Sequence, residues 1–378
     1  MKKGWSNVTL GDVAAHRNVF FDIDDLAEYK RCRVRLHAQG IELRDRIPGA
    51  LIKTKAQQRC RPADFLVAEI DAKVGGYGIV PESLDGAIVS SHYFLFETNR
   101  SVLDPLFLGY FSRSRYFAEQ VKARGSTNYA AIRPSHVLGY TIPLPPMAEQ
   151  QRIVARLDAI EARLTRARKL RAEAAKEAEA FTTSLHFAAA KGRVVRLRQL
   201  MQLDEKQDII TAEGSYPQVG IRSFGMGLFK KPPVIGANTT YRAFNVLHCG
   251  QFVMSQVKGW EGAVGVADED YEGWYASPEY RTFSCIEDEC DWKYLSHIAS
   301  TAWFQRQLLA ATKGIGARRE RVRPEMLLSL EMPFPAVTRQ TEAVTLLEKQ
   351  VAGKRLSALS VVREAAILPS LLDRIFYS

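Results

Sequence analysis

The stretch that decides the fold is Met147–Phe187, MAEQQRIVARLDAIEARLTRARKLRAEAAKEAEAFTTSLHF. It contains neither glycine nor proline, and the strong helix formers alanine, glutamate, arginine and leucine prevail. The composition predicts one helix of about 40 residues, which is ~60 Å long at a rise of ~1.5 Å per residue. Such a helix is much longer than an average globular helix, so we expect its apolar stripe to be buried against a partner.

A second segment, residues 337–378, carries the same apolar pattern, with steps of three and four residues. Heptad patterns of this kind predict coiled-coil pairing. Because one helix is internal and the other terminal, with a whole domain between them, we expect an antiparallel pair. The alternative is that each helix packs alone on its own domain. The first stripe is Ile153, Leu157, Ile160, Leu164, Ala167, Arg171, Ala174, Ala178, Phe181 and Leu185, and the second is Val344, Leu347, Val351, Lys354, Ala358, Val361, Ala365, Leu368, Leu372 and Ile375.

The rest of the chain is an internal repeat. An offset of 187 residues (262 minus 75) aligns Gly75, Gly78 and Gly86 with Gly262, Gly265 and Gly273, and it aligns several aromatic residues. After a three-residue insertion near 311–320 the offset becomes 190, which aligns Gln150 with Gln340. Glycines, prolines and aromatics dominate the matches, and their backbone or packing roles are hard to replace. The two halves should therefore share one fold and differ in polar sequence, as Asp71–Lys73 differs from Lys258–Trp260.

Each half is predicted to be a mixed α/β domain, with helices and strands in separate segments, which places it in the α+β class. Short apolar runs separated by glycine and proline predict strands, and helices are expected at 104–123 and 291–311. The predicted order is a globular domain at 1–146, a long helix at 147–189, a second globular domain at 190–336 and a terminal helix at 337–378. Two similar domains joined by antiparallel coiled-coil helices make a pseudo-twofold molecule.

Composition narrows the functional classes. The 378 residues are 46% apolar and 25% charged, which is typical of a folded protein. The net charge of +10 favours a polyanionic partner such as nucleic acid. No apolar run is long enough for a membrane span and no signal peptide is visible, so we expect a cytoplasmic protein. The five cysteines show no paired CxxC spacing, which predicts reduced thiols and no metal site.

Sequence-specific DNA binding requires phosphate contacts and side chains that reach base edges. The sequence offers basic and amide side chains in predicted loops of both halves, and asparagine can pair with adenine and arginine with guanine. For any one of them a merely solvated surface charge is the alternative, and the basic run Lys30–His37 is interpreted as a plain exposed face. The candidates are Lys53, Lys55, Arg59, Lys73, Tyr77, Thr127 and Asn128 in the first half, and Lys230, Lys231, Lys258, Trp260, Arg318, Arg319 and Arg321 in the second.

The segment Ile142–Val154, IPLPPMAEQQRIV, closely resembles the start of the long helix in specificity (S) subunits of type I restriction-modification enzymes. Ala68–Pro81 and Lys313–Val322 are similar to segments of that family's target recognition domains. The resemblance implies a chain without catalysis of its own. Each recognition domain would read one half of a bipartite, asymmetric DNA site, and the helices would act as a spacer ruler.

The same resemblance implies partners. Two methyltransferase (M) subunits would dock on the helices, and restriction (R) subunits would join that core. S-adenosylmethionine, ATP and Mg²⁺ would then belong to the partners, with no cofactor bound by this chain. Gln150, Arg152 and Gln340 are the candidate partner contacts, although Pro335–Gln340 departs from the pattern of Pro145–Gln150.

Two other functions compete with this interpretation. Asp64, Asp71 and Lys73 loosely fit the magnesium-binding arrangement of many nucleases, although the second half holds Gln251, Lys258 and Trp260 there. Phe224–Gly227 vaguely suggests a methyltransferase glycine turn, but the chain has no Asn/Asp-Pro-Pro-Tyr/Phe loop and no Walker-type phosphate loop. The third possibility is a scaffold that binds only protein.

Overall fold

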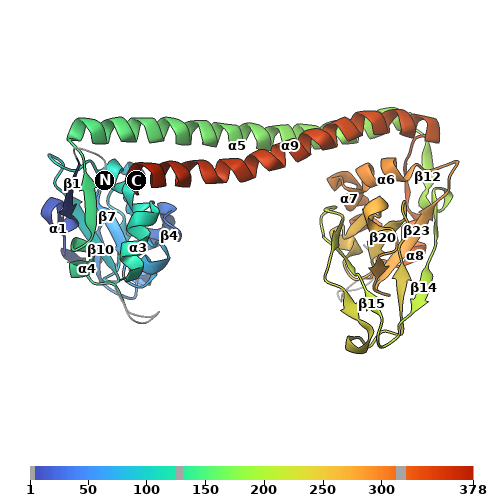
Figure 1. The fold of residues 1–378 in the computed structure, drawn as a ribbon, viewed down its shortest axis with the longest axis horizontal. Helices are drawn as coiled ribbons and strands as arrows, with labels where there is room; N and C mark the ends of the chain where they lie inside the picture. The colour runs from blue at the N-terminus through green and yellow to red at the C-terminus, as the bar shows by residue number, and fades with distance from the viewer. Residues whose placement is uncertain (1–4, 124–130, 312–320, 378) are drawn as a thin grey trace. The chain divides into compact units, whose positions relative to one another are not determined.

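A computed structural model describes residues 5–123, 131–311 and 321–377. The chain divides into two compact units. Unit 1 comprises Met1–Arg168 with Leu359–Ser378, and unit 2 comprises Lys169–Ala358. Each unit holds one mixed domain and part of both long helices, α5 (Met147–Ala190) and α9 (Val337–Phe376) (Figure 1). In the part of the chain that the structure describes, no helix combines the length and apolarity needed to span a membrane.

The domain of unit 1 is built around an antiparallel sheet of order β2-β10-β7-β8. Its middle strand β7 has the sequence FLVA and is buried throughout, and the rings of Phe65, Phe96 and Phe117 pack together in the core. Two helices, α2 (Pro105–Ser112) and α3 (Arg115–Ala123), lie against this sheet. The strands are β2 (Ala14–His16), β10 (Tyr93–Thr98), β7 (Phe65–Ala68) and β8 (Tyr77–Ile79).

Two further sheets complete unit 1. A five-stranded sheet has the order β3-β6-β9-β4-β5, and a two-stranded sheet pairs β1 with β11. The hairpin β4–β5 is long and brings the segment 36–39 beside the first sheet. The strands are β3 (Phe20–Asp22), β6 (Ala56–Arg59), β9 (Ile88–Val89), β4 (Glu28–Arg35), β5 (Gly40–Pro48), β1 (Ser6–Thr9) and β11 (Thr141–Leu144); the short helices are α1 (Leu10–Val13), η1 (Gly49–Leu51), η2 (Asp71–Val74), η3 (Glu82–Leu84) and α4 (Pro134–Leu138).

Unit 2 repeats the central sheet of unit 1 in the order β13-β23-β20-β21 and repeats the small sheet as β12-β24. The outer sheet differs, because it is divided into β14-β19-β22, β15-β18 and β16-β17. The strands are β12 (Val194–Arg196), β13 (Met201–Leu203), β14 (Lys206–Ile209), β15 (Ser215–Tyr216), β16 (Val219–Ile221), β17 (Leu228–Lys230), β18 (Val234–Ile235), β19 (Ala243–Val246), β20 (Phe252–Ser255), β21 (Val264–Val266), β22 (Tyr275–Ala276), β23 (Tyr280–Cys285) and β24 (Glu331–Pro333). The helices are η4 (Leu197–Gln199), η5 (Gly236–Asn238), η6 (Gly259–Glu261), η7 (Glu269–Tyr271), α6 (Trp292–Ala299), α7 (Ala302–Ala311) and α8 (Pro324–Ser329). The prediction of two similar α+β domains is confirmed.

The helix expected at 104–123 is two helices, and so is its counterpart at 291–311. The break lies at Ser114 in unit 1 and at Thr301 in unit 2. The Ser114 hydroxyl donates to the Phe111 carbonyl at 2.6 Å and accepts from the Phe117 amide at 3.3 Å. Thr301 makes the equivalent pair of bonds at 2.7 and 3.2 Å. Both hydroxyls satisfy backbone groups at the break, which a pattern of apolar residues does not reveal.

The long helices meet in antiparallel order. In unit 1 the start of α5 shares a core with the end of α9 through Ile153, Leu157, Leu372 and Phe376. In unit 2 the end of α5 meets the start of α9, where Thr182 Oγ1 donates to Gln350 Oε1 at 2.9 Å. The expectation that the helices pair with each other, rather than packing alone, is confirmed within each unit (Figure 1).

The predicted seam is wrong near its middle. Phe181 is 47% exposed and Val361 is 51% exposed, and Ala174, Lys354, Ala358 and Ala365 are exposed too. The neighbouring positions Thr182, Ser357, Ser360 and Glu364 are buried or half-buried instead. A straight helix drifts by ~20° per heptad relative to a 3.5-residue repeat, so the contact line passes to an adjacent residue after several heptads. The seam is therefore more polar than the sequence pattern predicted.

Candidate nucleic-acid interface

Two hairpin tips have the same backbone and occupy equivalent places in the repeat. Tip 1, residues 37–40, joins β4 to β5, and tip 2, residues 224–227, joins β16 to β17. In tip 1, φ is +60° at His37, +53° at Ala38 and +94° at Gly40. In tip 2, φ is +61° at Phe224, +65° at Gly225 and +71° at Gly227. Left-handed conformations at non-glycine residues are uncommon and mark both tips as constrained segments.

Backbone hydrogen bonds hold both tips in the same way. In unit 1 the His37 and Ala38 amides donate to the carbonyls of Val74 and Gly75 at 2.7 and 2.8 Å. In unit 2 the Phe224 and Gly225 amides donate to the carbonyls of Glu261 and Gly262 at 2.8 and 2.9 Å. The acceptors belong to the turns that follow β7 and β20. Each tip is therefore fixed to the central sheet of its own domain.

The repeated glycines explain how the tips fit. A Cβ on Gly78 would lie 3.1 Å from the Gly40 Cα, and a Cβ on Gly265 would lie 3.1 Å from the Gly227 Cα. Gly75 would place a Cβ 2.5 Å from the Ala38 amide nitrogen, and its φ of +82° is itself left-handed. Glycine permits both this close approach and this conformation. Two of the three glycine pairs that revealed the repeat, Gly75 with Gly262 and Gly78 with Gly265, therefore contact the tips or hydrogen-bond to them.

A basic groove lies beside tip 1. Its volume is about 420 Å³, and it runs between the tip, η2, α3 and the last turns of α9. Among the described residues that line it, the charged or titratable side chains are His37, Lys73, Tyr77, Arg113, Arg115, Lys122 and Asp373. Glu119, on the next turn of α3, accepts from Arg115 at 2.8 Å and raises the pKa of that guanidinium. The excess of cations gives the groove the charge that a phosphate backbone requires.

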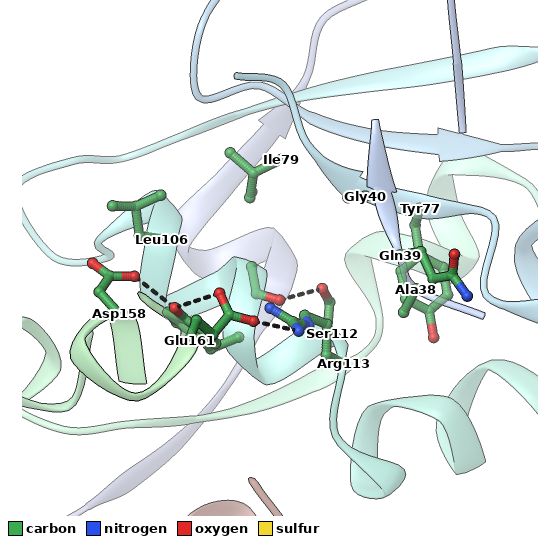
Figure 2. Close-up of a pocket in the computed structure, with 13 residues that line it drawn as sticks. Ala38, Gln39, Gly40, Tyr77, Ile79, Leu106, Ser112, Arg113, Asp158 and Glu161 are labelled. Carbon is green, nitrogen blue, oxygen red and sulfur yellow. Dashed lines mark hydrogen bonds and ion pairs between the residues drawn. The ribbon is translucent and has the colours of Figure 1, made fainter. Parts of the chain in front are cut away.

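A second cavity of about 380 Å³ also borders tip 1 (Figure 2). There Asp158 and Glu161 of α5 face α2, and Glu161 pairs with Arg113 at 2.6 Å. The Tyr110 hydroxyl donates to Asp158 Oδ1 at 2.5 Å and lies 3.0 Å from Glu161 Oε2. Burial and the two carboxylates raise the pKa of Tyr110, so the phenol stays protonated as a donor. This cluster fixes α2, and with it the wall of the groove, to α5.

The candidates in the first half have different environments. Lys73 lines the basic groove, whereas Lys53 is exposed on the loop before β6. Lys55 pairs with Asp25, and the Arg59 guanidinium lies 4.1 Å from the centre of the Phe21 ring. Thr127 and Asn128 fall outside the described residues.

The prediction for Tyr77 is wrong. It is only 3% exposed, and its ring packs 5.0 Å from that of Phe117 in the core. Tyr77 belongs to the inward face of β8, and its burial raises the pKa of the phenol.

In the second half, Lys258 immediately precedes η6 and Trp260 lies within it, and tip 2 is hydrogen-bonded to the end of this turn. Lys258 is exposed and lies 3.9 Å from Glu261, and Trp260 is 39% exposed while its indole donates to the Val257 carbonyl at 3.0 Å. Lys230 lies 4.9 Å from the Trp274 ring, Lys231 is exposed, and Arg321 lies 3.5 Å from Glu279. Arg318 and Arg319 fall outside the described residues. Lys258 and Trp260 are thus the candidates nearest tip 2.

Two of the candidate partner contacts are wrong. Gln150 and Gln340 are 0% exposed, so neither amide reaches a partner. Each side chain instead forms hydrogen bonds inside its own domain, and these bonds hold the start of a long helix in place. Arg152 does lie on the surface and pairs with Glu149 at 2.7 Å.

The geometry does not support the nuclease alternative. Asp64 and Asp71 lie at opposite ends of β7, and Asp64 is buried, with the Arg61 amide donating to it at 2.7 Å and Arg17 paired with it. Within the described ranges, no three His, Cys, Asp or Glu side chains gather in a metal-binding arrangement. The Phe224–Gly227 segment joins two antiparallel strands, which is not the strand–turn–helix of a methyltransferase site.

Sequence reasoning missed His37, Gln39 and Met226 of the tips and Arg113, Arg115 and Lys122 of the groove. The signal was present in the repeat, because the offset of 187 aligns Gly40 with Gly227 (227 minus 40 is 187). The differing residues just before those glycines would have identified the tips as variable segments on a shared scaffold.

Comparisons with known proteins agree with these observations. Residues 2–174 match the family described as "Type I restriction modification DNA specificity domain". The HsdS subunit from Thermoanaerobacter tengcongensis has a similar fold, with a TM-score of 0.58, 22% identity, and coverage of 100% of this chain and 97% of that one. A chain from a structure titled for "complex assembly and conformational transition of the type I R-M system" has a TM-score of 0.68, 21% identity, and coverage of 98% and 97%.

No curated protein sequence is detectably similar to the chain. The two structural likenesses show the fold, and the family match over residues 2–174 adds a signal from the sequence itself. Residues 2–174 thus resemble the type I restriction-modification DNA specificity domain, and the whole chain has a fold similar to that of the HsdS subunit.

Proposed function

We propose that the two domains are target recognition domains, each reading one half of a bipartite, asymmetric DNA site. The observation that carries this proposal is the divergent duplication: one backbone occurs twice and presents His37-Ala38-Gln39 in one copy and Phe224-Gly225-Met226 in the other. The same scaffold with different exposed side chains suits two readers of different base sequences. The basic groove beside tip 1 supplies phosphate contacts.

We also propose that the long helices dock the partner subunits. Helix α9 exposes aliphatic side chains on its outer surface: Leu356 is 70% exposed, Leu359 61% and Val362 72%. Exposed aliphatic residues at helical spacing are typical of protein–protein contacts. We assign them to two methyltransferase subunits, with restriction subunits joining that core. The chain itself acts without catalysis, S-adenosylmethionine, ATP and Mg²⁺ act on the partners, and the complex works in the cytoplasm, where its DNA lies.

The experiment compares adenine methylation across the genome in cells with and without this gene. We expect one bipartite adenine-methylated motif to disappear with the gene and to return when the gene is restored. A scaffold that binds only protein would leave the methylation pattern unchanged.

The salt dependence of DNA binding tests the same proposal independently. The affinity of the purified complex for its motif should fall steeply between ~50 and ~200 mM salt, because phosphate contacts release counterions. An affinity that does not change with salt would count against DNA as the partner.

A further inference from the structure

The tips combine a constant backbone with variable, exposed side chains. In both copies the first and third residues are exposed, namely His37 and Gln39 in tip 1 and Phe224 and Met226 in tip 2. The second and fourth residues are half-buried. Because the backbone hydrogen bonds of the two tips are equivalent, and Gly78 and Gly265 approach the tips in the same way, the side chains are presented in the same way from two domains.

The exposed side chains of tip 2 add little to the stability of their domain. Phe224 is 70% exposed and Met226 is 65% exposed, so neither contributes much to the core. Phe224 has a φ of +61°, a conformation that bulky side chains rarely adopt. Strained residues of this kind cluster at functional sites, where the fold holds them in place. The exposed, strained aromatic therefore points to a ligand.

The basic side chains near each tip favour double-stranded DNA as that ligand. Tip 1 borders the basic groove, to which Lys73, Arg113 and Lys122 contribute. At tip 2 the Glu261 carboxylate accepts from Ser223 at 2.9 Å and lies 3.9 Å from Lys258, which places that exposed ammonium beside the tip. A two-stranded β-ribbon fits the major groove of B-form DNA, and flanking cations would position it on the phosphates.

We propose that tips 1 and 2 enter the major groove of their half-sites and each read a base pair there. This inference rests on the proposed function and names the residues that carry its specificity. In tip 1 the Gln39 amide reads adenine, because its oxygen and nitrogen match the N6 and N7 of that base. In tip 2 Phe224 and Met226 contact the methyl group of thymine. The two tips thus give the two half-sites different sequences.

The experiment uses the complex of this chain with its methyltransferase subunits. Adenine methylation sequencing first defines the wild-type motif, and binding is then measured on the motif and on each single-base-pair change in it. The wild-type complex should discriminate against a change at a contacted base pair by about 5- to 150-fold. The double variant F224S/M226S should lose this discrimination at one T·A pair of the second half-site only. Gln39→Ala should lose it at one A·T pair of the first half-site only.

Two further variants keep the test independent of folding. Phe224→Asn removes the ring but suits the left-handed backbone, so it should relax the same base pair without loss of thermal stability. The double variant I209S/Y241S removes other exposed apolar side chains of unit 2, which are 77% and 43% exposed, and should leave the motif unchanged.

Unchanged discrimination at every base pair in F224S/M226S and in Q39A would overturn the inference, and so would a uniform loss of affinity on all duplexes. If the wild-type complex has no gene-dependent motif, the proposed function fails and this inference falls with it. If the wild-type complex has a clear motif and the tip variants leave it intact, base reading by the tips is rejected while the proposed function stands.

Discussion

At the residue scale, Gln150 and Gln340 make the same three hydrogen bonds at positions 190 residues apart. Gln340 Oε1 accepts from the Asp291 amide at 2.8 Å, and Nε2 donates to the Glu289 and Pro335 carbonyls, both at 2.8 Å. Gln150 does the same with Asp104, Val102 and Pro145 at 2.8 to 2.9 Å. Asp104 and Asp291 cap α2 and α6, so each glutamine ties the start of a long helix to the start of a domain helix.

Replacing Gln340 with alanine should destabilise unit 2. The change leaves the Asp291 amide and the Glu289 carbonyl without their partner, and an unsatisfied buried group costs about 1–3 kcal/mol. The Pro335 carbonyl keeps a hydrogen bond from Arg193 at 3.2 Å. We expect a lower urea midpoint and faster hydrogen exchange of the Asp291 amide. Arg152→Ala is the matched surface control, and its effect should stay within about 0.5 kcal/mol. Equal effects of the two variants would contradict the conclusion that the buried hydrogen bonds of Gln340 stabilise unit 2.

His186 predicts a pH dependence of the same unit. It is 0% exposed, its Nδ1 lies 2.8 Å from the Tyr294 hydroxyl, and burial lowers its pKa to about 4 from 6.5. The unfolded chain therefore binds a proton that the folded chain excludes between these values. The contribution of neutral His186 to the free energy of unfolding is fully present above pH 6.5. It falls as the pH drops towards 4, by up to about 3 kcal/mol.

The measurement is urea unfolding at pH 7.5 and at pH 5 for the wild type and for His186→Gln. The variant should lose less stability between the two pH values, because glutamine does not titrate. An identical loss in both proteins would show that other groups cause the acid sensitivity.

At the element scale, residue type predicted the existence of helices better than their contacts. The absence of glycine and proline between Met147 and Phe187 was sufficient to predict α5. The contact line on α5 was not predictable in the same way, because small drift per heptad moves Phe181 outward and Thr182 inward. The breaks at Ser114 and Thr301 depend on side-chain hydrogen bonds to the backbone, which apolar periodicity does not encode.

At the scale of the whole molecule, the proposed function makes the two long helices the elements that set the gap between half-sites. Removing seven residues, one heptad, from the middle of both α5 and α9 keeps the seam in register and shortens the pair by ~10.5 Å. At ~3.4 Å per base pair, the tolerated gap in the methylated motif should fall by about three base pairs. Adenine methylation sequencing of cells that carry the shortened gene measures this gap.

Insertion of one heptad into both helices is the matched control and should lengthen the gap by the same amount. Both half-site sequences should stay as they are in each variant, because the recognition domains are untouched. An unaltered gap in the shortened and the lengthened proteins would refute the proposal that the helices set the spacing between half-sites.

The sequence by itself determined the duplication, the α+β class, the two long helices and the resemblance to type I restriction-modification specificity (S) subunits, because glycine spacing, apolar periodicity and helix propensity are properties of the chain as written. The tertiary structure decided which polar residues are available. Tyr77, Gln150 and Gln340 are buried, and the His37 amide meets the Val74 carbonyl 37 positions along the chain (74 minus 37). Burial and long-range contact depend on which surfaces pack together, so only the folded chain brings the tips, the glycines and the basic groove to one place.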